Sequence, residues 1–299
     1  MANYDYVTFD VHYPDTSNTV VTGLNDYGVL VGIYTDAGGS TQGFKGHRHA
    51  TSVLLNVVPQ AISPHGLIVG WFDTPERGFL FAQGTFTSLA LDPPDSPGSP
   101  ALLTEILGVS LDGILVGDYR SAADQQFHGF RYDPQSRTLT TLDFPGATAT
   151  SVFDLNASGV AVGTFQDAQH DLHAFRLDGG VFTEVSVPGY VHPEFVGITD
   201  NDVVAGNAPE VGVGFVLDQG QVTVIQVPGS TLTELAGIRG DGTVYGRYID
   251  AAGVGHGFLA TPNGASRHRL QHHLAPAATM ASCDVGSKRW ACRATRRGQ

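Results

Sequence analysis

Three glutamates at matching positions of an internal repeat are the side chains in this sequence best suited to acid–base chemistry. The sequence contains six copies of the repeat, each with a small or polar residue followed by an aliphatic one. The residues three positions before that first residue are Val20, Val57, Glu105, Ser151, Glu194 and Glu234. If the copies are arranged around an axis, Glu105, Glu194 and Glu234 converge there and raise one another's pKa. The spacing therefore predicts a set of acid–base catalysts.

The same three glutamates allow two other interpretations. They could hold a divalent cation, because carboxylate oxygens are common ligands of such ions; no other cofactor is expected. Alternatively, each glutamate pairs with a turn amide or with water and has only a structural role. Substitution of the three glutamates distinguishes an enzyme from a scaffold. An enzyme would keep its fold and lose turnover, whereas a scaffold would tolerate the change.

A second set of residues varies from copy to copy directly after the pair that is Val-Gly in most copies. These residues are Ile33, Trp71, Asp118, Thr164, Asn207 and Arg247. Variation at one position of a rigid repeat is typical of a binding site. We therefore predict that Trp71 supplies an apolar wall and that Asp118 and Asn207 contact the substrate. Arg247 would bind a substrate carboxylate or neutralise Asp118 or Glu234.

Four histidines fall into two groups. His192 lies in an atypical loop two residues before Glu194, and we predict that it assists as an acid or base. His128, His173 and His256 each precede a Gly-Phe or Ala-Phe step at equivalent positions. A residue that recurs in several copies usually makes a hydrogen bond that belongs to the repeat, so these three are expected to be structural.

The elements that must position these residues are the strands of the repeat. In the clearest copy, polar turn residues separate two apolar runs: Gly23-Leu24-Asn25-Asp26-Tyr27-Gly28-Val29-Leu30-Val31-Gly32. The closing glycines are Gly32, Gly70, Gly117, Gly163, Gly206 and Gly246, with spacings of 38, 47, 46, 43 and 40 residues. A repeat of about 40 residues with strand composition is typical of β-propeller blades.

Each copy contains four strand-like segments, and the chain ends indicate how the ring closes. The sixth copy supplies three strands and ends after Phe258-Leu259, whereas residues 6–11 resemble a fourth strand. A first segment that completes the last blade removes two open sheet edges. We therefore predict an all-β fold, a single six-bladed propeller over residues 1–263. A two-sheet sandwich and an open array are the alternatives.

The repeat also resembles a known family. The chain from Gly23 to Asp36, followed by Gly43-Phe44, is similar to the bacterial HAF-type repeat, and the resemblance extends over about residues 6–262. The His-Ala-Phe signature of that family corresponds to residues 173–175, with His-Gly-Phe at residues 128–130 and 256–258. The resemblance implies a β-propeller but no settled chemistry, because one fold carries many functions.

Charge and composition narrow the classes of partner. Residues 264–299 contain seven Lys or Arg and one Asp, which leaves 9 basic and 28 acidic side chains and a net charge of −19 for the rest. A repeat region with this negative charge is expected to bind nucleic acid poorly, because phosphate contacts need a basic surface. No apolar run reaches the roughly 20 residues of a membrane span. The N-terminus has neither the basic start nor the apolar segment of a secretory signal, so we expect a cytoplasmic protein without a membrane partner.

The basic tail, residues 264–299, follows neither a strand nor a helix period, and we predict that it is disordered. It contains both cysteines, Cys283 and Cys292, so the repeat region can use neither disulfides nor a thiol nucleophile. The sequence also has no Gly-x-Ser-x-Gly elbow, phosphate-binding loop, dinucleotide fingerprint or His-Glu-x-x-His motif.

These observations favour a small-molecule enzyme with non-redox acid–base chemistry, such as a cyclase, isomerase, lyase or hydrolase. Its site would lie at the end of the central channel where the fourth-to-first and second-to-third strand connections converge. The alternative is a non-catalytic propeller that binds a ligand or a protein. A lectin-like module would have equivalent pockets in all blades, and the differences among Trp71, Asp118 and Arg247 argue against it.

Overall fold

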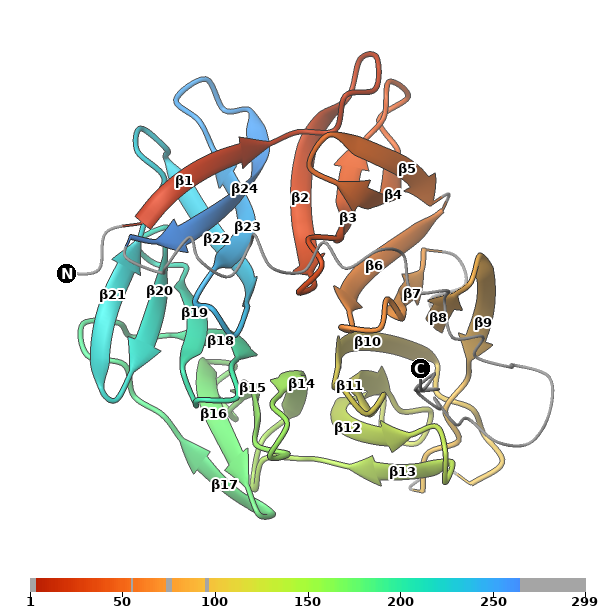
Figure 1. The fold of residues 1–299 in the computed structure, drawn as a ribbon. Coiled ribbons are helices and arrows are strands. Elements are labelled where there is room, and N and C mark those ends of the chain that lie inside the picture. The colour runs from red at the N-terminus through yellow and green to blue at the C-terminus, as the bar shows by residue number, and fades with distance from the viewer. Residues whose placement is uncertain (1–3, 55, 74–76, 95–96, 264–299) are drawn as a thin grey trace, which may run out of the picture.

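The computed structural model describes residues 4–263 apart from residue 55, residues 74–76 and residues 95–96. These residues form 24 strands in six four-stranded antiparallel sheets, arranged as blades around a central axis (Figure 1). The prediction of a six-bladed β-propeller is confirmed, and the sandwich and the open array are wrong. The tail predicted to be disordered, residues 264–299 with Cys283 and Cys292, lies outside the described residues.

The strands of each blade follow one another from the axis outward, and blades 1 to 6 are numbered along the chain. The innermost strands are β2 (Ser17–Leu24), β6 (Val57–Ile62), β10 (Leu103–Val109), β14 (Ala149–Leu155), β18 (Glu194–Ile198) and β22 (Leu232–Ile238). The second strands are β3 (Leu30–Thr35), β7 (Ile68–Phe72), β11 (Leu115–Arg120), β15 (Ala161–Gln166), β19 (Val204–Ala208) and β23 (Val244–Ile249).

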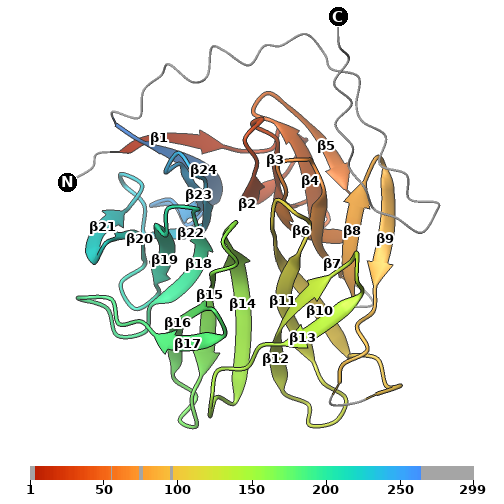
Figure 2. The same ribbon diagram turned by 60° about the horizontal axis from the view of Figure 1, so that its bottom comes forward.

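The outer half of each blade consists of its third and fourth strands, which are seen from a second direction in Figure 2. The third strands are β4 (Thr41–His47), β8 (Gly78–Ala82), β12 (Phe127–Asp133), β16 (Leu172–Asp178), β20 (Val213–Asp218) and β24 (Gly255–Pro262). The outermost strands are β5 (Ala50–Leu54), β9 (Thr85–Leu89), β13 (Thr138–Thr141), β17 (Val181–Glu184), β21 (Gln221–Ile225) and, in blade 6, β1 (Tyr4–Phe9).

The N-terminal strand closes the ring. β1 pairs with β24 in antiparallel register, from Tyr4 opposite Pro262 to Phe9 opposite Gly257 (Figure 1). Blade 6 therefore combines the first described strand of the chain with the last three. This confirms the closure predicted from the sequence, and it means that the ring cannot open without breaking these strand pairs.

Aromatic side chains of the third strands form the core between the blades. The fully buried members are Phe44, Phe79, Phe130, Phe175, Phe215 and Phe258, one from each Gly-Phe or Ala-Phe step. In blade 3 the ring of Phe130 lies over Gly117, where an added Cβ would be 3.0 Å from that ring and 1.9 Å from the carbonyl oxygen of Glu105. The closing glycine of the repeat therefore permits a close approach that no larger residue allows.

Each innermost strand contains a β-bulge that separates two levels along the axis. The pairing register shifts at Thr22, Gln60, Leu107, Phe153, Val196 and Ala236. A bulge bends the strand and changes the direction of its side chains. Glu105, Glu194 and Glu234 lie before the bulge, at the level of the strand starts. Asp154 lies after it, at the level of the turns that lead to the second strands.

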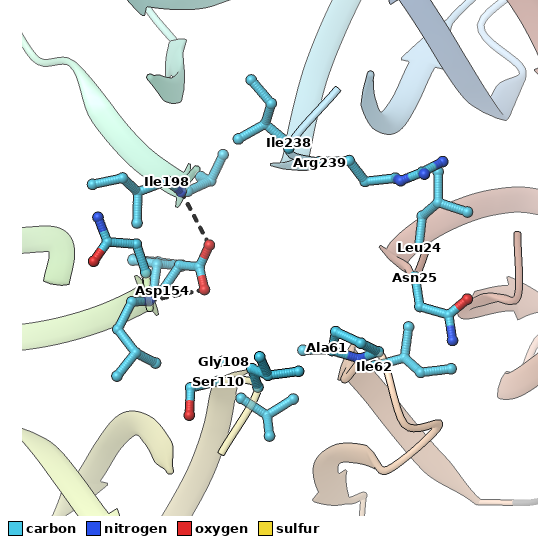
Figure 3. A pocket seen from close by; sticks show the side chains of 18 of the residues that line it. Leu24, Asn25, Ala61, Ile62, Gly108, Ser110, Asp154, Ile198, Ile238 and Arg239 are labelled. Atoms are coloured by element: carbon cyan, nitrogen blue, oxygen red, sulfur yellow. Dashed lines mark hydrogen bonds between the residues drawn. The ribbon is translucent and has the colours of Figure 1, made fainter. Parts of the chain in front are cut away.

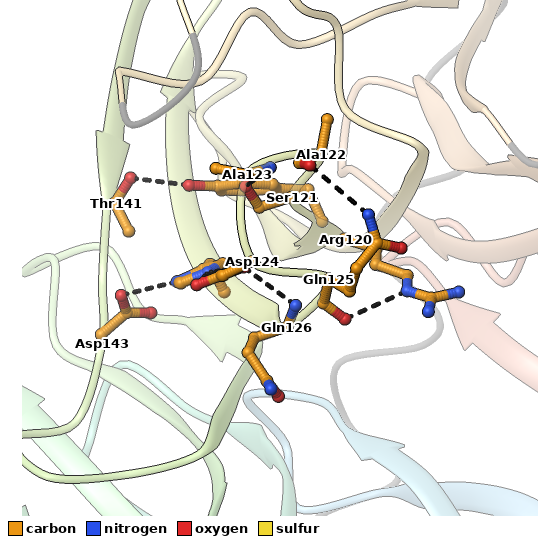
Figure 4. Close-up of polar contacts among 11 residues, drawn as sticks. Arg120, Ser121, Ala122, Ala123, Asp124, Gln125, Gln126, Thr141 and Asp143 are labelled. Atoms are coloured by element: carbon orange, nitrogen blue, oxygen red, sulfur yellow. Dashed lines mark hydrogen bonds and ion pairs between the residues drawn. The ribbon is translucent and has the colours of Figure 1, made fainter.

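The three histidines predicted to be structural each join two acidic side chains. One acid lies between the second and third strands, and the other lies in or just after the fourth strand. The groups are His128 with Asp124 and Asp143, His173 with Asp167 and Glu184, and His256 with Asp250 and Asp10. Figure 4 shows Asp124 and Asp143 of the blade 3 group. Each histidine thus ties the outer edge of its blade together.

His256→Gln is expected to lower the unfolding free energy by less than about 1 kcal/mol at pH 6 and by clearly less at pH 9. Burial lowers the pKa of His256, but the hydrogen bonds and charges of Asp10 and Asp250 outweigh it and raise the pKa above its ordinary value. A raised histidine pKa adds stability at pH values below the unfolded-state pKa, and this stability is lost as the pH rises through the folded-state pKa. Urea denaturation measures the effect, with the exposed His12→Gln as control. An equal loss at both pH values would contradict this ionic role.

Candidate functional site

The two residue sets predicted from the repeat face each other on adjacent strands. The opposed pairs are Val58 with Trp71, Glu105 with Asp118, Glu194 with Asn207, and Glu234 with Arg247. Residues directly opposite each other in an antiparallel pair place their side chains side by side on one face. The structure therefore brings the predicted catalytic and binding residues together, pair by pair, at one end of the propeller.

The pairing in blade 2 corrects the sequence alignment by one residue. Val58, not Val57, lies opposite Trp71, whereas Val57 is buried in a core cluster. A shift of one residue turns a side chain to the other face of its strand. Trp71 is half-buried beside an aliphatic neighbour, which suits the apolar wall that the sequence predicts.

Asp118 has the most strongly perturbed pKa of the predicted site residues. Its side chain is only 5% exposed. Burial raises the pKa of Asp118 to about 7; the charge of Glu105 adds to this rise, and a hydrogen bond with Ser151 acts against it. Within the described residues, Oδ1 of Asp118 has no hydrogen-bond partner. Near neutral pH, this carboxyl group can therefore donate a proton to a bound molecule.

A pocket of about 260 Å³ lies beside Asp118, between blades 3 and 4. It is lined by Asp118, Phe127, Ala149, Ser151, Thr164, Phe165, Gln166 and Leu172. Phe127 and Leu172 are each 37% exposed, so apolar surface is offered to a ligand there. Asp118, Ser151 and Thr164 form the polar part. The pocket lies at the end of the propeller that the sequence predicts, where the second strands lead into the third.

Asn207 has a different role from the one predicted for it. Its Nδ2 donates to the carbonyl oxygen of Leu235 at 2.9 Å, and the N–H of Leu235 donates to its Oδ1 at 2.8 Å. Both ends of the amide are therefore engaged by the backbone of the next blade. Asn207 connects blades 5 and 6 and is not free to bind a substrate without breaking these bonds. Beside it, burial raises the pKa of Glu194, and the charges of Glu234 and Glu210 add to the rise.

Glu234 and Arg247 form an ion pair in blade 6. The Nε–H of Arg247 donates to a carboxylate oxygen of Glu234, and the two side chains are 38% and 41% exposed. Of the two partners that the sequence allowed for Arg247, the structure shows Glu234. A pair this exposed contributes at most about 1 kcal/mol to stability, so the guanidinium can exchange its partner for a carboxylate of a ligand at little cost.

His192 lies at the edge of the predicted set. It belongs to the loop before β18, and its Nδ1 lies 3.3 Å from the carbonyl oxygen of Leu172 in blade 4. This contact places the ring between blades 4 and 5. Its acid–base role stays a prediction from the sequence.

A second cavity, of about 200 Å³, lies on the axis at the opposite end of the propeller (Figure 3). Residues from all six blades line it, beginning at the bulges. Asp154 faces it from blade 4 and accepts hydrogen bonds from the N–H groups of Leu155 at 2.8 Å and Ile198 at 3.0 Å. Burial raises the pKa of Asp154 to about 7; the two backbone hydrogen bonds act against this rise, and the charge of Asp200 adds to it.

Comparison with known proteins supports the fold. No protein-family model matches the chain, and a search of curated proteins found no match. Among solved structures, a gluconolactonase from Xanthomonas campestris is similar, with a TM-score of 0.55 and 13% identity over 87% of this chain and 89% of that chain. The chain is a six-bladed β-propeller.

Two further propellers show the range of proteins with this architecture. A virginiamycin B lyase from Staphylococcus aureus has a TM-score of 0.50 and 13% identity, over 86% of this chain and 88% of that chain. The Aleuria aurantia lectin has a TM-score of 0.50 and 11% identity, over 85% of this chain and 93% of that chain. At such identities the likeness shows the fold alone, and the resemblance to the HAF-type repeat stays a prediction.

Neither a metal site nor a membrane span is found in the part of the chain that the structure describes. In those residues, no three His, Cys, Asp or Glu side chains are arranged so that they could hold a metal ion. The divalent cation suggested for Glu105, Glu194 and Glu234 stays a prediction. The same residues contain no helix with the length and apolar character needed to cross a membrane.

Asp154 is the residue that the sequence analysis missed. The equivalent positions of the other blades are Gly23, Ala61, Gly108, Gly197 and Gly237. An aspartate at a position that is otherwise Gly or Ala is the same kind of departure that singled out Asp118. The bulge conceals this position in the sequence, because spacing alone does not place blade 2 in register with the other blades and a polar residue also fits the repeat pattern there.

Proposed function

We propose that the protein is an enzyme that performs non-redox acid–base chemistry on a small molecule bound beside Asp118. The observation that carries this proposal is the buried carboxyl group of Asp118, whose Oδ1 has no partner within the described residues and which lies opposite Glu105. Its pKa of about 7 keeps a proton available near neutral pH. A protonated carboxyl group next to a second carboxylate suits a division of roles in which Asp118 donates a proton and Glu105 removes one.

The pocket favours a substrate with an apolar body and one polar reacting group. Phe127, Phe165 and Leu172 would contact the body, while Asp118 and Ser151 would contact the reacting group. A cyclisation, isomerisation, elimination or hydrolysis fits, because each adds a proton at one atom and removes a proton from another. Glu194, the Glu234–Arg247 pair and His192 lie in neighbouring blades or loops at the same end, and we retain them as further catalytic and binding candidates.

The proposal predicts that Asp118→Asn and Glu105→Gln each lower kcat/KM at least 100-fold while the fold is retained. The assay follows mixtures of small esters, lactones and β-elimination substrates by proton NMR, and circular dichroism checks the fold. Asp218→Asn, which removes an exposed carboxylate in blade 5, is the matched control. Because the acid must be protonated, the rate should fall above about pH 7. Wild-type turnover by Asp118→Asn would overturn the proposal.

A non-catalytic binding protein is the second candidate, and the exposed apolar rim of the pocket favours it as much as it favours an enzyme. Propellers similar to this chain include a gluconolactonase and a lectin, so this architecture accommodates both classes. Saturation-transfer NMR with the same mixtures separates them. A compound that binds the wild type and is not converted, even after long incubation, would favour a binding protein over an enzyme.

A further inference from the structure

The axial cavity brings together three departures from the repeat. Asp154 stands where the other blades have Gly or Ala. Tyr245 stands where the other blades have Val31, Val69, Val116, Val162 and Ala205. Arg239 stands where they have Asn25, Ser63, Ser110, Asn156 and Thr199. All three departures line the same cavity, and such local variation in a rigid repeat is typical of a binding site.

The polar side of the cavity is preorganised. Asp154 is fixed by two backbone N–H groups, one from its own strand end and one from blade 5; Figure 3 shows its carboxylate pointing toward Ile198. The hydroxyl of Tyr245 lies over Gly237, where an added Cβ would be 2.3 Å away. Burial raises the pKa of Tyr245, the charge of Asp154 adds to the rise, and the charge of Arg239 opposes it. These three groups therefore interact across the cavity.

The charge of the lining favours a cation. Its charged residues are Asp26, Asp154, Asp200 and Arg239. Nη2 of Arg239 is paired with Asp26 and Asp241, each at 3.4 Å, while its buried Nε has no hydrogen-bond partner among the described residues. Asp154 and Asp200 have no basic partner among the described residues of the lining. A ligand that brings a positive charge to Asp154 would supply the missing partner, and Coulomb attraction is stronger in a partly enclosed cavity than in water.

At the level of the bulges the lining is apolar in four of the six blades. The bulged residues of four consecutive blades, Leu107, Phe153, Val196 and Ala236, line the cavity, whereas blades 1 and 2 contribute Thr22 and Gln60 at this level. The cavity volume is about 200 Å³, and a cavity of roughly 150 Å³ holds a benzene-sized molecule. A single ring with a short polar substituent therefore fits.

We propose that the axial cavity binds a small organic ammonium ion, with its charged group at Asp154 and Tyr245 and its apolar part against Leu107, Phe153 and Val196. This site is separate from the pocket beside Asp118, because it lies at the other end of the innermost strands. The proposal does not depend on the proposed enzyme activity.

Fluorine NMR with 4-fluorobenzylammonium, and with neutral 4-fluorobenzyl alcohol as its isostere, tests the proposal. The wild type should bind the ammonium at least tenfold more tightly than the alcohol. Asp154→Asn should abolish this preference. Asp112→Asn, which removes an exposed carboxylate on the same hairpin end outside the cavity, should leave it unchanged. Equal affinities for the two compounds, or an undiminished preference in Asp154→Asn, would overturn the proposal.

The pH dependence in the wild type gives a second test that does not require a variant to fold. Asp154 must be ionised to attract the ammonium, so binding should weaken at least tenfold between pH 8 and pH 5.5, while binding of the alcohol should not change. The other groups that face Asp154 are Asp200, Tyr245 and Arg239, with Asp26 behind Arg239. Burial raises the pKa of Tyr245, so its hydroxyl stays protonated over this range. Ammonium binding that is equally tight at both pH values would contradict the proposal.

Discussion

Asp118→Asn is expected to make the protein more stable at pH 8 and to leave its stability almost unchanged at pH 4. In the folded chain the pKa of Asp118 rises to about 7, whereas in the unfolded chain it is near 3.9. Between these values the unfolded state binds fewer protons than the folded state, so stability falls as the pH rises. Each pKa unit corresponds to about 1.4 kcal/mol, and the gain from the substitution at pH 8 is therefore at most about 4 kcal/mol.

The equivalent position of blade 5 holds an amide. Asn207 is the residue of blade 5 that corresponds to Asp118, and its side chain bonds both the N–H and the carbonyl of Leu235 in the next blade. The residue of blade 4 that corresponds to Leu235 is Val152. An asparagine at position 118 would face the backbone of Val152, and it would carry no charge at either pH, so the cost of burying a carboxylate disappears.

Urea denaturation at pH 4 and pH 8 measures this effect, with Asp218→Asn as the exposed control. If Asp118→Asn instead lowers stability at pH 8, the carboxylate is ionised and structural, and the proposed role as proton donor is lost. If Asp118→Asn is more stable at pH 8, then Asp118 lowers the stability of the wild type relative to a neutral asparagine at the same position. Such a cost is typical of functional residues, and it would support the site beside Asp118.

Asp154 provides a useful contrast to Asp118, because the two carboxyl groups have similar pKa values for different structural reasons. Both oxygens of Asp154 accept a backbone N–H, so Asp154→Asn would place an N–H₂ group against one of these donors. We therefore expect little or no gain in stability at Asp154. A raised pKa by itself does not distinguish these cases, and the hydrogen-bond partners do.

The architecture was predictable from the sequence because each copy of the repeat contains the residues that make the contacts common to all blades. The Gly-Phe steps supply the buried rings between the blades. The variable residues Ile33, Asp118 and Arg247 lie opposite residues of the innermost strands. The closing strand was predictable for the same reason, since residues 6–11 have the pattern of a fourth strand. The two residue sets were predicted separately, and the register of β10 and β11 is what pairs Glu105 with Asp118.

The sequence predicted the site less completely because side-chain roles depend on neighbouring blades. Asp118 and Asn207 occupy equivalent positions, yet Asn207 is bonded to the next backbone and Asp118 keeps an oxygen without a partner among the described residues. Nothing in the spacing separates them. Asp154 could not be predicted because a bulge precedes it and hides its position in the repeat. The axial cavity that it lines also lies at the end of the axis opposite to the predicted site.

Gly117→Ala is expected to lower the unfolding free energy by about 3 kcal/mol or more, because its Cβ would lie 1.9 Å from the carbonyl oxygen of Glu105. Overpacking a core with flexible neighbours usually costs about 1–3 kcal/mol, but here the neighbour is backbone of a paired strand. Gly84→Ala is the matched control: it has φ of +80° and nothing within 4 Å of an added Cβ, so only backbone strain of roughly 1–2 kcal/mol applies.

Urea denaturation of both variants makes the comparison, and the affinity for any ligand of the Asp118 pocket reports the local consequence. Gly117 directly precedes Asp118 on β11 and pairs with Ile106, so relief of the clash must push β10 and β11 apart next to the point where Glu105 and Asp118 face each other. If Gly117→Ala is no more destabilising than Gly84→Ala, the closing glycine is not required for the close approach of the two strands. The close approach of β10 and β11 at Glu105 and Asp118 would then have another cause than the packing of the blade.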